Sequence, residues 1–314
     1  MPIERELKFR IRARAAPAVA ALLGTRADTR RLVSTYFDTR GGLLRRAEGL
    51  ELAAFPLDEI RSVTRTDLAR AGKRLRPVST TRFVRSSIPV KLAGGGRAEL
   101  CIDRGEVAAG RRKERFHELA IELKAGGAVA LLRYAEGLAR TPGVELAFES
   151  KAERGYRLAA GHKRAAPRKW RAPALHRKAT PADAFTALFS AALAQAGANT
   201  EGVLESTDPE YLHQLRVGLR RLRSALRAFQ PLLAAGAAKP LIRRMRKLMR
   251  VLGAARDWDV FVDWLEETRA PGALLLHARR KQGAARRDAR RLISSPEFQG
   301  FLLRSLRWLH GSRR

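Results

Sequence analysis

The spacing of apolar residues changes part-way along the chain, and this change constrains the fold more than any other feature. Within the first 160 residues several short stretches alternate, as in IERELKFRI, where Glu4, Glu6 and Lys8 share one face. Such alternation is typical of β-strands. Beyond residue 181, apolar residues recur every three or four positions, as on one face of a helix. We therefore expect an α+β domain followed by an all-α helical bundle.

The α+β domain is expected over residues 1–160, with a largely antiparallel sheet. Two further alternating stretches predict strands, AELCIDRG (98–105) and HELAIELKAG (117–126). Helical patterns occupy 16–24 and 128–140, and glycine-rich segments at 94–96 and 104–112 indicate turns. Residues 161–180 contain two prolines and many basic residues, which is a linker composition.

The helical domain is expected over residues 181–314. Its predicted helices cover 181–199, 208–233, 239–267, 274–294 and 296–311. The second of them has clear start signals, because Asp208 can cap the helix and Pro209 suits its first position. Thr207 and Glu210 have the spacing of a capping box. Gly253 predicts a break within the third helix.

The charge of the chain limits its partners. The 314 residues carry a net charge of +32, which attracts polyanions such as nucleic acid, an anionic membrane surface or a phosphate chain. A single cysteine, Cys101, fits a reducing compartment. No secretory signal and no run of roughly 20 apolar residues is found, so we expect a cytoplasmic protein without a membrane span.

One segment concentrates this charge. From Tyr211 to Arg256 there are twelve Lys or Arg and no Asp or Glu. A stripe of leucines along 208–233 predicts the core face, and the cations recur beside it at the same spacing. The next helix repeats the arrangement with the stripe Leu241, Met245, Leu248 and Leu252. The candidate phosphate-binding residues are His213, Arg216, Arg220, Arg223, Arg227, Arg243, Arg246, Lys247 and Arg250.

This arrangement favours a phosphate-bearing ligand. Like charges at helical neighbour positions cost about 0.2–0.5 kcal/mol per pair, and no acid offsets that cost here. Guanidinium groups match phosphate oxygens two at a time. Nucleic-acid binders usually offer aromatic residues for stacking, whereas Phe229, Trp258 and Trp264 sit in apolar patterns that predict core positions. Inorganic polyphosphate is therefore preferred over nucleic acid; a solvated face or an acidic protein partner is the remaining alternative.

Two motifs in this half resemble a known family. HQLRVGLRRLRSALRAF, followed by LGAARDWDVFVDWL, is similar to the CHAD domain over about residues 180–314. The resemblance implies a pair of four-helix bundles that bind inorganic polyphosphate on a basic surface. That family continues into a second basic helix, so we expect the second half of the domain to be truncated here. A second chain in a homodimer would supply the absent wall.

The alternating strands of the first domain carry candidate metal ligands. Glu4, Glu6 and Lys8 point to one side of their strand, and Glu118, Glu122 and Lys124 do so on another. Glu99 and Asp103 add acids. Paired carboxylates can hold a hard cation such as Mg²⁺, and a lysine can hold a phosphate oxygen. An exposed sheet face with alternating charges is the structural alternative.

This half resembles the CYTH, or triphosphate tunnel, family. The matching stretches are IERELKF, STYFDT, TTRF, ELCIDRGEV, ELAIELKAG and SKAERGYRL. The resemblance implies an antiparallel β-tunnel that hydrolyses a triphosphate with Mg²⁺ or Mn²⁺. It assigns metal binding to Glu4, Glu6, Glu118 and Glu122, and triphosphate binding to Lys8, Arg82, Lys124 and Lys151.

The sequence departs from the CYTH pattern at several positions. Glu51 stands where an arginine is expected, and a pair of strands is expected to be missing after about residue 50. Ala120 replaces an acid and Val84 an arginine. We therefore expect a polyphosphate-binding protein, located in the cytoplasm or on polyphosphate granules, whose triphosphatase site is weakened. The alternatives are an active inorganic triphosphatase and a generic nucleic-acid-associated protein.

Overall fold

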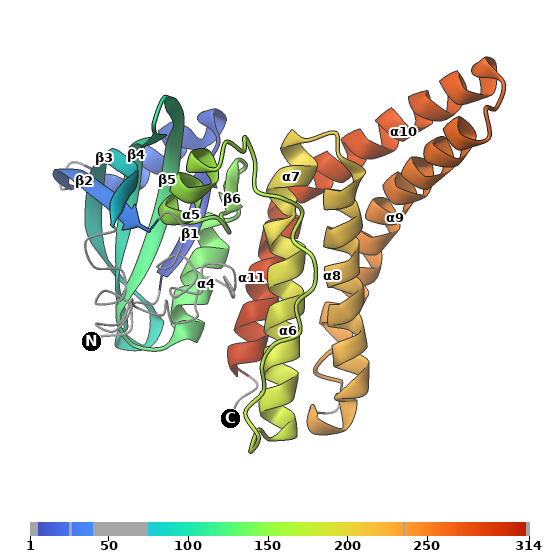
Figure 1. The fold of residues 1–314 in the computed structure, drawn as a ribbon. Helices are drawn as coiled ribbons and strands as arrows, with labels where there is room; N and C mark the ends of the chain where they lie inside the picture. Colours follow the sequence, from blue (N-terminus) through green and yellow to red (C-terminus); the bar gives the residue numbers. More distant parts are fainter. Residues whose placement is uncertain (1–5, 25–26, 40–74, 235, 312–314) are drawn as a thin grey trace. The chain divides into compact units, whose positions relative to one another are not determined.

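The computed structural model describes residues 6–24, 27–39, 75–234 and 236–311. The chain divides into two compact units, Met1–Ala166 and Pro167–Arg314 (Figure 1). The predicted α+β and all-α classes are confirmed, because strands fill the first unit and helices the second.

The N-terminal unit is built around an antiparallel sheet of six strands. The strands are β1 (Glu6–Ile11), β2 (Asp28–Asp38), β3 (Arg76–Lys91), β4 (Arg97–Ala109), β5 (Arg112–Ala125) and β6 (Val144–Leu146). Their order is β2-β3-β4-β5-β1-β6, so β2 and β6 form the edges and the described strands make an open sheet. The helices are α1 (Ala16–Leu23), α4 (Ala128–Leu138) and α5 (Lys151–Ala159), with short 3₁₀ turns at Ala13–Ala15 and Ala93–Gly95.

The two faces of this sheet have different character. Leu7 and Phe9 of β1 pair in register with Ile121 and Leu119 of β5, and all four side chains are fully buried. The helix α4 lies along β5 and adds apolar residues to this core (Figure 1). The other face carries the charged residues of the alternating strands, and α5 covers part of it.

Most sequence predictions for this unit are confirmed. The strands, the helices at 16–24 and 128–140, and the turn near 94–96 are present. The turn predicted for 104–112 is wrong, because β4 continues to Ala109 and only its end turns through Gly110, whose φ is 57°. Val107 is fully buried in this stretch, and its packing outweighs the glycines. Glu51 and the strands expected to be missing lie outside the described residues.

The helical unit contains six helices among the described residues. They are α6 (Pro181–Ala198), α7 (Thr200–Glu205), α8 (Pro209–Ala228), α9 (Lys239–Glu267), α10 (Gly272–Ile293) and α11 (Pro296–Gly311), with a 3₁₀ turn at Gln230–Leu232. The predicted cap of α8 is confirmed, because Asp208 accepts a hydrogen bond from the Glu210 amide at 2.8 Å. The predicted break at Gly253 is wrong, since α9 continues through this buried glycine.

Part of the predicted linker is held against the helical unit. The side chain of Asn199, which is fully buried, accepts a hydrogen bond from the Arg168 amide and donates one to the Arg168 carbonyl, both at 3.0 Å. The Arg221 guanidinium lies 4.6 Å from the ring centroid of Trp170. Within the predicted linker, residues 168–170 are therefore held by Asn199 and α8.

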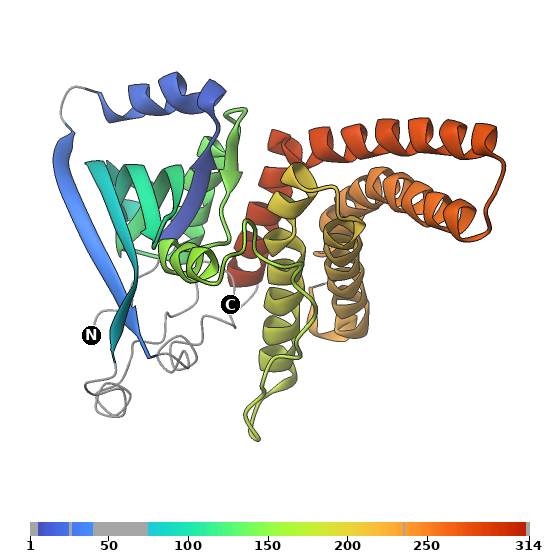
Figure 2. The ribbon, with the colours of Figure 1, turned by 45° about the horizontal axis from the view of Figure 1, so that its top comes forward.

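The C-terminal half of α9 and the N-terminal half of α10 form a hairpin that extends beyond the other helices of this unit (Figure 2). Val262, Leu265 and Ala278 form its small core, with Trp258 and Leu275 packed against them. Across the helices that the structure describes, none has both the length and the apolar character needed to cross a bilayer.

Candidate functional site

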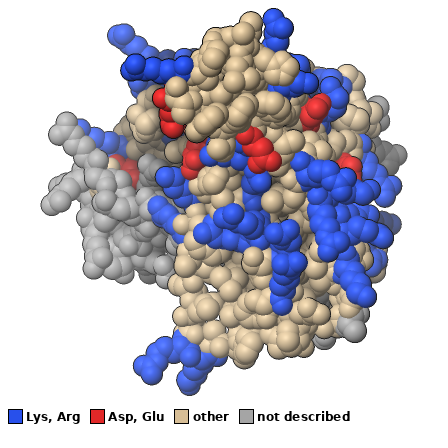
Figure 3. All heavy atoms as spheres, turned by 90° about the vertical axis from the view of Figure 1, so that its right-hand side faces the viewer, with Lys and Arg blue, Asp and Glu red and all other residues tan. Residues whose placement is uncertain are grey.

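The leucine stripe and the cations separate as the sequence predicts. Leu215, Leu219, Leu222 and Leu226 are at most 1% exposed, and the stripe of α9 is buried as well. The predicted cations lie outside these stripes, partly or fully exposed. We define the basic face as His213, Arg216, Arg220, Arg223 and Arg227 of α8 with Arg243, Arg246, Lys247, Arg250 and Arg256 of α9. Figure 3 shows Lys and Arg side chains gathered on this side of the molecule.

Arg216 lies between α8 and α9. Its Nη1 is 3.7 Å from a carboxylate oxygen of Asp257, and its Nε is buried without a hydrogen-bond acceptor among the described residues. Burial lowers the pKa of Arg216, and the charges of Arg256 and Arg220 add to this effect although Asp257 opposes it. A partly buried guanidinium with an unused donor favours an incoming anion.

His213 sits one helical turn before Arg216. Burial lowers the pKa of its imidazole, and the charge of Arg256 lowers it further. A nearby phosphate would have the opposite effect, because an anion favours the charged imidazolium. The histidine and Arg216 therefore form the part of the basic face where an anion would gain most.

The rest of the basic face is not neutralised within the described part of the chain. There, Arg216 is the one member that forms an ion pair, and its carboxylate partner is 79% exposed. Surface cations of folded proteins usually alternate with acids, so this arrangement leaves a concentrated positive field. Such a field, combined with guanidinium donors, can hold a run of phosphate groups.

Two further cations belong to this region although the sequence analysis did not select them. Arg256 interacts electrostatically with both His213 and Arg216. Arg244 lines a hollow of about 420 Å³ together with Arg243, Lys247 and Glu297. Both residues lie in the acid-free segment, so the charge run itself was the signal for them.

The prediction that Trp264 is a core residue is wrong. Its side chain is 53% exposed, and its ring stacks on that of Phe261 at 5.9 Å between centroids. The apolar pattern of α9 suggested that Trp264 is buried, but the C-terminal half of α9 packs against α10 on one side and its other side is exposed. By contrast, Phe229 lies against Phe185 with centroids 5.4 Å apart, and Trp258 packs against the hairpin core.

The N-terminal unit brings several predicted ligands onto one face of the sheet. Glu6 pairs in register with Glu122, which pairs in register with Glu99, so three carboxylates form a row across β1, β5 and β4. The Lys124 ammonium lies 2.5 Å from Glu122 and 3.1 Å from Glu99. Burial disfavours its charged form, yet these hydrogen bonds raise the pKa of Lys124 overall. Lys8 pairs with Glu6 at 2.8 Å.

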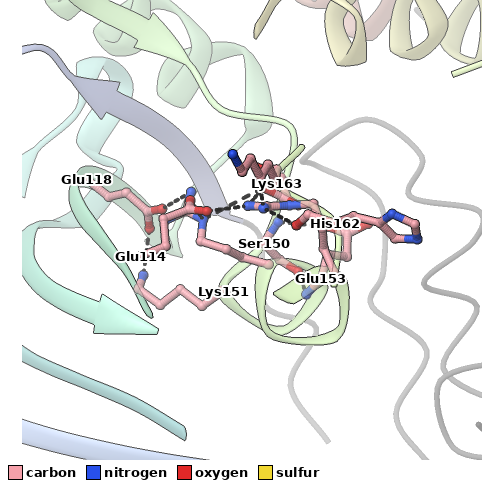
Figure 4. A network of polar contacts seen from close by, with 10 residues as sticks. Glu114, Glu118, Ser150, Lys151, Glu153, His162 and Lys163 are labelled. Atoms are coloured by element: carbon pink, nitrogen blue, oxygen red, sulfur yellow. Dashed lines mark hydrogen bonds and ion pairs between the residues drawn. The ribbon is translucent and has the colours of Figure 1, made fainter. Parts of the chain in front are cut away.

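Lys151 and Glu118 contact each other in a buried network beneath α5 (Figure 4). The Lys151 ammonium lies 2.8 Å from Glu118 and 2.9 Å from Asp103. Arg154 reaches the second oxygen of Glu118 at 3.0 Å. Burial raises the pKa of Glu118, but the charges of Lys151 and Arg154 outweigh it and the pKa is lowered.

Arg82 does not join these residues. It is exposed on β3. The alternation of that strand places Arg82 and Val84 on one face of the sheet and Arg85 on the other. Arg85 is the arginine that meets Asp103, through two hydrogen bonds of 2.7 Å. Arg85 was not among the predicted site residues; it lies in register opposite Asp103 of β4, a pairing that the sequence alone does not give.

A metal site was tested against the described carboxylates. Oxygen ligands of this kind suit Mg²⁺. However, no group of three or more Asp, Glu, His or Cys side chains in residues 6–24, 27–39, 75–234 and 236–311 is placed to hold an ion. Ala120 lies in register between Lys8 and Cys101 and adds no ligand. Glu4, a predicted ligand, lies outside the described residues.

Comparison with known proteins bears on the resemblance of the helical unit. Residues 187–314 match the CHAD domain, which confirms this resemblance for the helical part of the chain. The crystal structure of the CHAD domain from the plant Ricinus communis is similar, with 34% sequence identity and a TM-score of 0.42. That match covers 47% of this chain and 51% of the plant chain. The CYTH resemblance of the N-terminal half stays a prediction.

Proposed function

We propose that the helical unit binds inorganic polyphosphate along the basic face. The observation that carries this proposal is the lack of ion-pair partners for these cations, except Arg216, within the described residues. The buried Nε of Arg216 adds a donor without an acceptor there. The resemblance to the CHAD domain implies the same ligand class.

The chemistry of the face favours a phosphate chain over nucleic acid. Its members supply guanidinium, ammonium and imidazole donors that bind phosphate, and they include no Phe, Tyr or Trp on which successive bases could stack. The exposed rings of Phe261 and Trp264 lie on a part of α9 with Asp257, Asp263 and Glu267, where acids would repel nucleic-acid phosphates. A ligand made of phosphate alone uses the basic face without needing those rings.

A competition titration tests this choice. Labelled long-chain polyphosphate would be bound to the full chain at near-physiological salt and challenged with duplex DNA at equal phosphate concentration. We expect DNA to compete poorly. Equal competition would indicate a generic polyanion surface, because non-specific phosphate contacts do not distinguish what carries the phosphate.

A triple substitution locates the site. Replacing Arg216, Arg220 and Arg223 with Gln should weaken polyphosphate binding by at least about a thousandfold, since each of the three lost charge-assisted hydrogen bonds contributes about 1.5–3 kcal/mol. The matched control replaces Arg104, Arg111 and Arg115, which are exposed in the N-terminal unit, and changes the net charge equally. Equal losses in both variants would contradict a localised site.

For the N-terminal unit we propose a CYTH-like site with slow or absent triphosphatase activity. The support is that Lys8, Lys124 and Lys151 are bonded to carboxylates of the same sheet, so few groups remain to bind substrate. Phosphate release from tripolyphosphate would be measured with Mg²⁺ or Mn²⁺. Rapid release that disappears in Glu122→Gln would favour a working triphosphatase instead.

A further inference from the structure

The hairpin of α9 and α10 carries an exposed apolar patch. Its members are Val260, Phe261 and Trp264 on α9 with Leu274 and Leu276 on α10, each 37–54% exposed. They are five of the eleven exposed large hydrophobic residues of the described chain and fall within 17 residues. Such clustering marks a contact surface, whereas single exposed apolar residues are ordinary.

The side chains between the two helices of the hairpin already contact one another. Val262, Leu265 and Ala278 bury their side chains between the two helices. Asp259 accepts hydrogen bonds from Arg286 at 2.6 Å and from Gln282 at 3.0 Å. These contacts fix the hairpin, so the apolar patch is the part of its surface without a partner among the described residues.

The two helices of the hairpin have opposite charge. From Asp257 to Glu267, α9 has five acids and no Lys or Arg. From Gly272 to Arg287, α10 has no acid and five Lys or Arg. Two of the acids, Asp259 and Glu266, pair with Arg286 and Arg279 of the other helix; Asp259 is buried, whereas the Glu266–Arg279 pair is exposed. The remaining charges of both signs stay on its surface.

We propose that the patch binds a second copy of this chain, with α9 of one protomer against α10 of its partner. A two-fold axis makes both contacts at once, as closed homodimers require. Phe261 and Trp264 would then pack near Leu274 or Leu276 of the partner subunit, which lie on different sides of α10. The exposed acids Asp263 and Glu267 would face basic side chains of the partner's α10.

The charge pattern selects a second copy over a polyanion. The acids of α9 would repel phosphate groups at this place, whereas α10 of another copy offers both apolar and basic residues. Figure 3 shows acidic side chains bordering uncharged surface above the region where Lys and Arg gather. The net charge of +32 opposes association of two chains, and added salt screens this long-range repulsion.

Sedimentation velocity of the full chain over a concentration series tests the proposal. We expect a monomer–dimer equilibrium whose dissociation constant rises at least tenfold in the double variant Phe261→Ser and Trp264→Ser. The matched control is Leu232→Ser, because Leu232 is 52% exposed outside the patch. Circular dichroism should be unchanged in every variant, since the replaced side chains are exposed.

A charge exchange provides the second test. Asp263→Lys with Glu267→Lys should weaken the dimer, as should Arg280→Glu with Lys281→Glu, and combining all four changes should restore it. A wild-type chain that stays monomeric at every concentration and salt would overturn the proposal. So would association that the patch variants leave unchanged, or quenching of Trp264 by a single-stranded oligonucleotide without any self-association.

Discussion

At the scale of single residues, we expect His213 to couple the proposed polyphosphate binding to pH. Burial and the charge of Arg256 lower the pKa of the free imidazole, and bound phosphate raises it, so binding takes up a proton. We therefore expect polyphosphate affinity to rise as the pH falls from about 8 to about 6. Comparing this slope in the wild type and in His213→Gln separates the histidine from titration of the ligand. Equal slopes would contradict the prediction.

Lys151 is the first residue of α5 and joins this helix to the sheet through Asp103 and Glu118. Replacing it with Met would leave Asp103 and Glu118 buried without this partner, which should lower the free energy of unfolding by about 3–5 kcal/mol. Hydrogen exchange of the amides of β4 and β5 measures this loss. The control Lys113→Met removes an exposed pair with Glu106 and should cost less than about 1 kcal/mol. Similar losses would argue against a structural role for Lys151.

At the scale of elements, Gly218 sets how closely α8 approaches α6. A Cβ at this position would lie 2.6 Å from the amide nitrogen of Ala196 and 2.9 Å from the carbonyl oxygen of Ala192. Gly218→Ala should therefore destabilise the helical unit by about 1–3 kcal/mol. Gly283→Ala is the control, because its Cβ meets only Arg287 at 3.5 Å, and it should stabilise α10 by up to about 1 kcal/mol. Thermal unfolding of both variants tests the opposite signs.

The same scale shows what the sequence could predict. The leucine spacing predicts α8 and its buried stripe correctly, because a helix of that length repeats its pattern several times. The parity of the strands likewise places Glu6, Glu118 and Glu122 on one face. The sequence pattern does not show which side chains contact one another, however. That Glu118 meets Lys151 depends on α5 crossing the sheet, and that Trp264 is exposed depends on α10 covering only one side of this part of α9.

At the scale of the whole molecule, the two units differ in how their lysines and arginines are paired with carboxylates. In the N-terminal unit, lysines and arginines of the polar face are bonded to carboxylates, as Lys124 and Arg85 illustrate. In the helical unit, the cations of the basic face lack ion pairs among the described residues, apart from Arg216. A cation that is paired with a carboxylate of the same unit contributes to stability, whereas a group of unpaired cations attracts an anionic ligand. Both units carry a net positive charge, but the basic face of the helical unit is where neighbouring cations lack ion pairs among the described residues.

If the chain forms the proposed dimer, the affinity of its basic faces for polyphosphate should depend on the length of the polyphosphate chain. A dimer presents two basic faces, and a polyphosphate chain long enough to contact both gains affinity through its effective concentration at the second face. We therefore expect the double variant Phe261→Ser and Trp264→Ser to bind long polyphosphate at least about tenfold more weakly than the wild type. Binding of a short oligophosphate should be unchanged, because it occupies one face only. Isothermal titration with both lengths measures the difference, and Leu232→Ser again serves as the control. An equal loss for both lengths would mean that the aromatic residues support the basic face directly, and no loss for either would mean that each face binds its own chain.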